Sequence, residues 1–224
     1  MLLREEGEAV VCIGQPAHAW LSGQIARAWR EPPEPWEEVC LAAEQHDVGW
    51  ARADLAPELN PDTGRPYTFI ELPIPRHAAI WSAAPELVLP QSRYAALLVS
   101  MHGVALYERR DLDALPPDHG RIVREYLDSQ RALQERLIES LGADRDQVRR
   151  NQRLVWAWDS LSLGLCLRWD LEDMLEPWPF RTERVLFRTE GRRLEGHFDD
   201  EDEMRAAFAS APWVELHFEL ERPA

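Results

Sequence analysis

The sequence contains no lysine, because all 25 of its basic residues are arginines. This absence excludes mechanisms that need a lysine amine, such as Schiff-base catalysis and phosphate binding by a P-loop. Acidic residues are more numerous, and the formal net charge is −15. Nucleic acids and anionic membranes attract dense positive surfaces, so the charge balance argues against both as partners. A negative field favours divalent cations, although only weakly and non-specifically.

Cysteine is scarce as well. The three residues, Cys12, Cys40 and Cys166, lie far apart in apolar segments and match neither a disulfide framework nor a zinc-ligand spacing. Residues 1–8 lack the apolar core of a signal peptide, and no apolar run reaches membrane-spanning length. These absences predict a protein of the reducing cytoplasm that does not enter a membrane.

The length and composition suit a single domain that spans residues 1–224. A chain of 224 residues with 45% hydrophobic content can bury one sizeable core. Seventeen prolines against eleven glycines indicate many firm turns and few flexible linkers. The ten tryptophans fit a large core, and they fit equally well an apolar patch at which a homodimer would form.

Hydrophobic periodicity predicts a mainly α fold with a small antiparallel β-sheet. Helical patterns cover 16–29, 36–47, 76–84, 91–108, 119–141, 151–169 and 203–209. Strand patterns cover 8–13, 184–187, 194–198 and 213–220, and the second and third of these meet around Gly191. We expect the N-terminal strand to pair with the C-terminal strands. The chain then has a helical core at about residues 15–169 and a β-rich extension at about 180–224.

Residues 51–75 carry prolines at short intervals and leave no room for a long helix. A long irregular segment inside a compact domain is often functional. Because it follows a His-Asp pair directly, it is a candidate lid or rim for a site. A rigid surface wrap explains the same composition.

The His-Asp pair, His46-Asp47, closes the apolar stripe of the helix at 36–47. Trp36, Val39 and Ala43 recur at helical spacing, and the pair falls on the same face one turn later. A buried imidazole beside a buried carboxylate needs a partner, because an unpaired buried charge is strongly disfavoured. A divalent metal satisfies both groups, and a core histidine bonded to its neighbour is the simpler alternative.

Four further polar residues lie on inward helix faces: His18, His77, His102 and Asp159. Asp159 stands in the most apolar helix, where a metal, an arginine or a bond to Ser162 would satisfy it. With His46 and Asp47, they supply four imidazoles and two carboxylates from five helices. These are the usual ligands of Zn, Fe, Mn or Co. One ion would use four of them, whereas all six suit two ions bridged by Asp47.

The order H…HD…H…H…D across residues 18–159 resembles the HD-domain superfamily. Its members are all-helical metalloproteins, mostly phosphohydrolases, with a branch of di-iron oxygenases. The stretches Gln15-Pro16-Ala17-His18, His46-Asp47-Val48-Gly49-Trp50 and Asp159-Ser160-Leu161-Ser162-Leu163 also resemble an uncharacterised bacterial family of HD-like proteins with a domain-of-unknown-function label. The resemblance implies a first metal on His18, His46, Asp47 and Asp159, and a second on Asp47, His77 and His102.

The resemblance implies a phosphohydrolase that acts on a small phosphorylated metabolite or nucleotide. Asp47 would take part in catalysis through the metal, and Asp54 is a candidate base. Arg76 and Arg65 are candidates to bind phosphate, because no lysine is present. Trp50 occupies a position where HD enzymes often carry a substrate-binding lysine, and it would stack on a substrate ring or form a wall. A di-iron oxygenase and a non-catalytic metal-binding protein are the alternatives.

Overall fold

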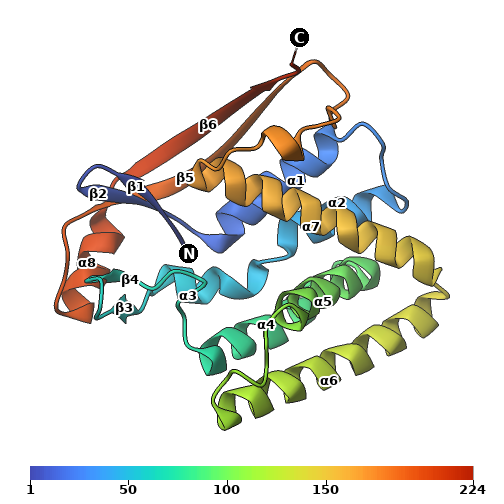
Figure 1. The fold of residues 1–224 in the computed structure, drawn as a ribbon, viewed down its shortest axis with the longest axis horizontal. Coiled ribbons are helices and arrows are strands. Elements are labelled where there is room, and N and C mark those ends of the chain that lie inside the picture. The colour runs from blue at the N-terminus through green and yellow to red at the C-terminus, as the bar shows by residue number, and fades with distance from the viewer. Residues whose placement is uncertain (224) are drawn as a thin grey trace.

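The computed structural model describes residues 1–223. Figure 1 shows a β-sheet on one side of the molecule, a layer with α1, α2 and α7 beneath it, and α4, α5 and α6 on the far side. The helices are α1 (Gln15–Ala28), α2 (Trp36–Gln45), α3 (Ala51–Leu55), α4 (Ile74–Val88), α5 (Arg93–Glu108), α6 (Pro117–Leu141), α7 (Arg145–Leu167) and α8 (Glu201–Ser210). The prediction of a mainly α fold is confirmed.

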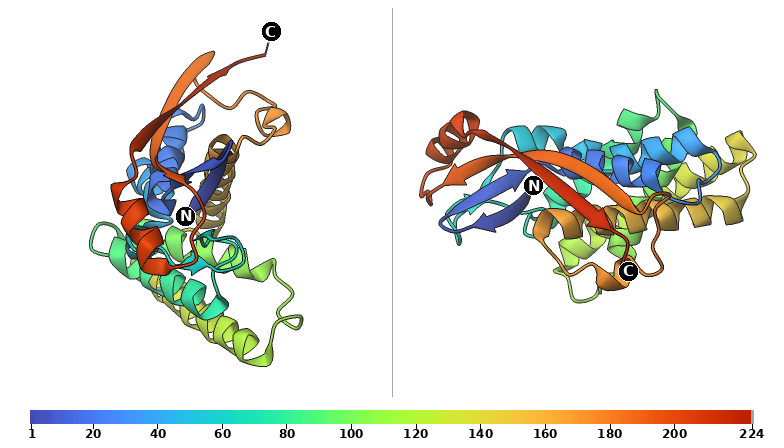
Figure 2. Two further views of the ribbon diagram at one scale, coloured as in Figure 1. Left: turned by 90° about the vertical axis from the view of Figure 1, so that its left-hand side faces the viewer. Right: turned by 90° about the horizontal axis from the view of Figure 1, so that it is seen from above.

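The sheet joins both ends of the chain, as predicted. Its strands are β1 (Leu2–Glu6), β2 (Ala9–Ile13), β5 (Arg184–Glu195) and β6 (Trp213–Glu221), in the order β1-β2-β5-β6 with antiparallel pairs. The register places Val10 opposite Leu194. The long β5–β6 hairpin runs across α1 (Figure 2). Among residues 1–223, no helix is long and apolar enough to cross a membrane.

Strand β5 corrects the prediction of two strands, 184–187 and 194–198, separated at Gly191. The strand runs unbroken from Arg184 to Glu195 and passes through the glycine. A Cβ atom at Gly191 would lie 2.8 Å from the carbonyl oxygen of Cys12 and 2.7 Å from a side-chain carbon of Val11. The glycine therefore allows β2 to approach closely, and it does not form a turn.

Three other elements differ from the predictions. Helix α4 continues past Pro85 to Val88, because Ala84, Pro85 and Val88 are buried and their packing outweighs the lost backbone bond. Helix α7 starts at Arg145, where the Asp144 side chain accepts a bond from the Gln147 amide and caps a polar first turn. Strand β1 was not predicted, because its sequence, LLREE, does not alternate between apolar and charged residues.

The segment 51–75 contains α3 and a small hairpin of β3 (Leu59–Asn60) and β4 (Arg65–Pro66). Backbone bonds fix it at two places. The Phe69 amide donates to the Met1 carbonyl at 3.1 Å, and the Phe198 amide donates to the Gly64 carbonyl at 2.8 Å. The segment thus contains no long helix, as expected.

Helix α5 links two hydrophobic cores. Leu97 and Leu98 belong to a large core shared with the sheet, α1, α2 and α7. Val104 and Tyr107 belong to a second core shared with α4 and α6. His102 lies between these two pairs along the helix, so a buried polar residue marks the junction of the two cores.

Candidate metal centre

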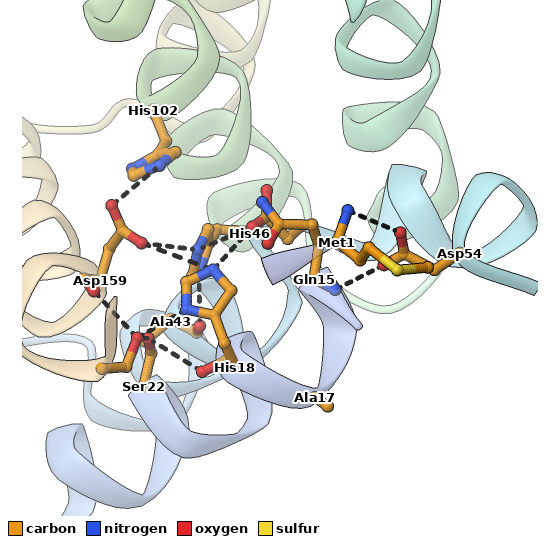
Figure 3. A network of polar contacts seen from close by, with 12 residues as sticks. Met1, Gln15, Ala17, His18, Ser22, Ala43, His46, Asp54, His102 and Asp159 are labelled. Carbon is orange, nitrogen blue, oxygen red and sulfur yellow. Dashed lines mark hydrogen bonds and ion pairs between the residues drawn. The ribbon is translucent and has the colours of Figure 1, made fainter. Parts of the chain in front are cut away.

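Five buried polar residues from four parts of the helical layer come together in two overlapping groups. Figure 3 labels His18, His46, His102 and Asp159 among them. His18 comes from α1, His102 from α5 and Asp159 from α7, while His46 and Asp47 directly follow α2. Their exposed fractions are 1% for His18, 0% for His46, 3% for Asp47, 2% for His102 and 5% for Asp159. The structure brings together five of the six residues that the sequence suggested as metal ligands.

The ligand atoms form two overlapping groups, each within 4.8 Å: His18, His46 and Asp47, and His46, His102 and Asp159. The Nε2 atom of His18 lies 2.8 Å from Oδ2 of Asp47. The Nε2 atom of His46 lies 3.5 Å from Oδ2 of Asp47 and 3.3 Å from Oδ1 of Asp159. The Nε2 atom of His102 lies 3.6 Å from Oδ2 of Asp159. All three imidazoles therefore direct Nε2 at the carboxylates.

Hydrogen bonds on the outer side of the rings orient two of these imidazoles. Nδ1 of His46 lies 2.8 Å from the Ala43 carbonyl oxygen, which can only accept, so Nδ1 carries the proton. The neutral ring then has its lone pair on Nε2, which is the form that binds a metal. Nδ1 of His18 lies 2.7 Å from the Ser162 hydroxyl.

The electrostatics of the cluster couple imidazoles to carboxylates. Burial lowers the pKa of His46, but Asp47 and Asp159 outweigh burial and hold that pKa well above its ordinary value. Burial raises the pKa of Asp47, yet His46 and His18 bring it well below its ordinary value. For His102, burial and then the charge of His46 lower the pKa to about 4. In the metal-free protein, a proton on His46 offsets part of the negative charge that a cation would otherwise neutralise.

The residues present fit a divalent transition metal. Three buried atoms, His46 Nε2, Asp47 Oδ1 and His102 Nδ1, have no hydrogen-bond partner within residues 1–223. Buried polar atoms without a partner are disfavoured, and an ion would satisfy the first two directly. Imidazole nitrogens and carboxylate oxygens are also the donors that Zn, Fe, Mn and Co accept. An imidazole Nε2 has one lone pair, so His46 can bind only one ion although both groups include it.

His77, the sixth suggested ligand, lies outside both groups. Its Nδ1 is 2.6 Å from the Tyr107 hydroxyl, and its Nε2 accepts a bond of 3.4 Å from the Trp81 indole. Burial, and then the charge of Arg110, lower the pKa of His77 to about 4. Both nitrogens of a neutral ring are thereby occupied, and His77 is held among aromatic side chains.

Trp50 and Asp54 both contact other parts of the chain. Trp50 is 2% exposed, and its ring meets that of His77 edge-on at 5.4 Å. Oδ1 of Asp54 lies 3.0 Å from the Met1 amino group, and Oδ2 accepts a bond from the Gln15 amide at 2.5 Å (Figure 3). Burial raises the pKa of Asp54, although the nearby amino group opposes the shift. Asp54 thus has both oxygens engaged.

The two arginines suggested for phosphate binding are engaged elsewhere. Arg76 is exposed and pairs with Glu58 at 2.7 Å. Arg65 is buried at the β1–β2 hairpin, where it pairs with Glu5 at 3.0 Å and donates to the Glu8 carbonyl. The structure does not bring either guanidinium group into the His/Asp cluster.

An aromatic stack next to the cluster was missed in the sequence. The His102 ring lies between those of Trp81 and Trp156, with centroids 5.7 and 5.4 Å away. The Arg109 guanidinium covers Trp156, with its Cζ atom 3.9 Å from the ring centroid. Helical spacing could have indicated these neighbours. Trp156 is three residues before Asp159 and Arg109 is seven residues after His102, so each shares a helix face with a cluster residue. The half-buried Trp156 connects exposed Arg109 to the cluster.

Comparison with known proteins shows that the cluster residues all lie in the region that matches one protein-family model. A family model described as "Protein of unknown function (DUF3891)" matches residues 1–174. All five cluster residues fall inside that span, whereas β5, α8 and β6 lie beyond it. No curated protein and no solved structure matches the chain. The expected relation to a family with a domain-of-unknown-function label is confirmed, and the relation to the HD-domain superfamily stays a prediction.

Proposed function

We propose that this chain, which belongs to the DUF3891 family of proteins of unknown function, is a metal-dependent phosphohydrolase with an HD-type centre. One observation carries the proposal. The H…HD…D residues from separate helices converge with His102 into two groups that share His46. Three imidazoles and two carboxylates carry a large desolvation cost in a hydrophobic interior, and a bound cation would offset it.

The proposed centre holds one ion. His18, His46, Asp47 and Asp159 supply the ligands, and His102 supplies a fifth donor from the opposite side. A single ion is favoured because Nε2 of His46 can serve only one, and because His77 already bonds to Tyr107 and Trp81. A di-iron oxygenase site would require His77 to give up one of those bonds, because the ring nitrogen that binds a metal cannot keep its hydrogen-bond partner.

In the proposed reaction, the chain binds and orients a phosphate ester beside Asp47. A divalent ion, when bound, lowers the pKa of a water from about 16 towards about 7 and offsets phosphoryl charge. Asp47 would take part by holding that ion, and its Oδ1 is buried without a hydrogen-bond partner in residues 1–223. Asp54 is the candidate base once it releases the Met1 amino group.

The remaining phosphate charge requires arginine. Arg109 is the best-placed guanidinium, because it covers Trp156, which in turn stacks on His102. Arg76 or Arg65 would bind phosphate only after leaving Glu58 or Glu5. Trp50 would act as a wall of the pocket. The buried free thiols support the reducing cytoplasm as the place of reaction.

Metal content and turnover test the proposal together. Protein purified without a His tag should contain about one equivalent of a divalent transition metal by elemental mass spectrometry. Asp47→Ala and Asp159→Ala should lose the metal and at least about 100-fold in turnover of a panel of phosphomonoesters and nucleotides, as expected for lost metal ligands. Asp54→Asn serves as a control that retains the metal. A wild-type protein without stoichiometric metal, before or after reconstitution, would refute the proposal.

A second candidate, a metal-stabilised protein without catalysis, is favoured by the burial of the cluster, whose members are 0–5% exposed. An ion enclosed to this degree can act as a structural link between helices. In that case chelation unfolds the chain, re-addition of the ion restores the fold, and no phosphate ester is turned over. A phosphohydrolase instead loses turnover on chelation at concentrations of chelator that leave the circular dichroism unchanged.

A further inference from the structure

Two serine hydroxyls lie behind His18, on the side opposite Asp47. Ser22 follows His18 by one turn of α1, and Ser162 follows Asp159 by one turn of α7. Both side chains are fully buried. Oγ of Ser162 is 2.7 Å from Nδ1 of His18 and 2.9 Å from the Asp159 carbonyl oxygen. Oγ of Ser22, which is labelled beside His18 in Figure 3, donates to Oγ of Ser162 at 2.8 Å.

The Ser22 hydroxyl also lies 3.3 Å from the Trp158 carbonyl oxygen and 3.4 Å from the His18 carbonyl oxygen. When it donates to Ser162, the shortest of these contacts at 2.8 Å, counting protons gives two complete arrangements of the remaining bonds. In the first, Nδ1–H of His18 donates to Ser162, and the Ser162 hydroxyl donates to the Asp159 carbonyl oxygen. In the second, the Ser162 hydroxyl donates to Nδ1, and Nε2–H of His18 donates to Asp47 at 2.8 Å. In both, Ser22 donates to Ser162, and a hydroxyl uses its one proton and no more than two lone pairs.

The two ligand imidazoles differ in this respect. His46 bonds to the Ala43 carbonyl oxygen, which only accepts, so its tautomer is fixed. His18 bonds to a hydroxyl, which either donates or accepts, so both of its neutral tautomers are satisfied. A buried hydrogen-bonding group that keeps its partner in both states avoids the free-energy penalty of an unsatisfied polar atom.

We propose that Ser162 is the positioning residue of His18, and that its hydroxyl reverses direction when the centre takes up an ion. Without an ion, Nε2 of His18 carries the ring proton and donates it in a hydrogen bond to Asp47, while the Ser162 hydroxyl donates to Nδ1. With an ion on Nε2, the ring proton is on Nδ1 and Ser162 turns to the Asp159 carbonyl. Imidazole and hydroxyl hold the same two protons in both states, so the net change is one proton moved from Nε2 to Nδ1. Ser22 anchors Ser162 in both.

The inference rests on the proposed metal centre, but it does not depend on phosphate-ester hydrolysis. It also differs from a packing role. A serine that only fills space would affect stability when replaced, yet it would not determine which nitrogen of His18 carries the proton. The tautomer of His18 is therefore the property that separates a positioning role from a structural one.

Zinc affinity provides the first measurement. Ser162→Ala should weaken Zn²⁺ binding by about 10- to 100-fold in competition with a chelating indicator, as for other partners of metal-bound histidines. Ser162→Thr retains the hydroxyl and should restore most of the affinity. Ser22→Ala should cause a smaller loss, below about tenfold, because it removes one supporting bond. The matched control is Ser160→Ala on the same helix, whose hydroxyl bonds to the Trp156 carbonyl at 2.9 Å and should not matter.

Histidine ¹⁵N NMR provides the second measurement. Wild-type protein should show His18 protonated on Nε2 without metal and on Nδ1 when loaded with Zn²⁺. The proposal is overturned if His18 has the same tautomer in both states, if Ser162→Ala binds Zn²⁺ as tightly as Ser160→Ala, or if the wild type binds no zinc. A wild type that binds zinc and changes tautomer, but hydrolyses no phosphate ester, supports this inference and refutes only the proposed activity.

Discussion

His46 is the residue on which the cluster depends most. Its Nε2 lies within 3.5 Å of both carboxylates, and both ligand groups include it. The Ala43 carbonyl fixes its ring from the other side. His77 has the opposite character, because aromatic neighbours occupy both of its nitrogens. Two histidines that look alike in the sequence therefore have different chemical roles.

The first prediction contrasts these two histidines. His46→Gln should remove most of the bound metal, because it deletes the imidazole ligand of the proposed ion that Asp47 and Asp159 also bind. His77→Gln should keep about the wild-type metal content, because the native ring has no free lone pair to offer. Elemental analysis of both purified variants, with circular dichroism to confirm folding, makes the comparison. Equal loss of metal in the two variants would assign His77 to a ligand set and contradict the single-ion centre.

The second prediction concerns the pH dependence of stability in metal-free protein. His77 has a pKa of about 4 in the folded chain, mainly because it is buried, against an ordinary value of 6.5. Between these values the unfolded chain binds more protons, so the free energy of unfolding should decrease as the pH falls. A full shift of this size corresponds to about 3 kcal/mol.

Urea denaturation at pH 7 and at pH 4.5 in the presence of chelator measures this decrease. His77→Gln should be destabilised at pH 7, yet it should lose less additional stability on acidification than the wild type does. An identical decrease in both proteins would show that His77 does not remain neutral in the fold. His102, also lowered to a pKa of about 4, accounts for a further part of the wild-type decrease.

At the scale of elements, β5 shows how a local pattern misleads. A glycine in the middle of an alternating stretch commonly marks a turn or a bulge. Here the neighbouring strand supplies the reason for the glycine, since β2 approaches at Gly191. That cause is tertiary, so no window of sequence around residue 191 contains it.

The third prediction follows from this close approach. Gly191→Ala places a methyl group 2.8 Å from the backbone oxygen of Cys12, and backbone cannot move aside as a flexible side chain can. We expect a loss of about 1–3 kcal/mol in the free energy of unfolding. Glu190→Ala, one residue earlier on the exposed face, is the control and should change little. Equal stability of the two variants in urea would show that β2 and β5 separate easily.

At the scale of the whole molecule, the region that matches the family model ends before the folded unit does. The match ends at residue 174, but β2 is buried along its whole length and pairs with β5, which begins at Arg184. The segment beyond 174 therefore completes the sheet of the matched region. It also supplies Phe180 and Phe187 to the large core.

The fourth prediction tests this dependence. A chain shortened to residues 1–174 should aggregate, because it exposes the apolar strand β2 as a free edge. Size-exclusion chromatography compares it with the complete chain. A chain that ends at Glu221, the last residue of β6, should remain like the wild type. A shortened chain that stays monomeric and helical would show that the C-terminal hairpin is an addition to an independent domain.

The sequence predicted the helical layer well and most of the residues that meet in the His/Asp cluster. Inward histidines and Asp159 were recognisable because each stands on an apolar stripe, and helical periodicity is local. His77 shares that periodicity, and only the positions of Tyr107 and Trp81 on neighbouring helices distinguish it from the others. The ion pairs of Arg76 and Arg65 also depend on tertiary neighbours, so their engagement could not be deduced from spacing.

The positions of the cluster residues along the chain determine the order in which they emerge during synthesis. His18 lies near the start of the chain, whereas its partner Ser162 is 144 positions later. Synthesis proceeds from the N-terminus, and helix α7 emerges from the ribosome only after the other helices of the cluster. His18, His46 and Asp47 are therefore exposed to cellular metals before Asp159 exists. The growing chain first offers only part of the proposed metal centre, and α7 then supplies Asp159 and completes the buried cluster.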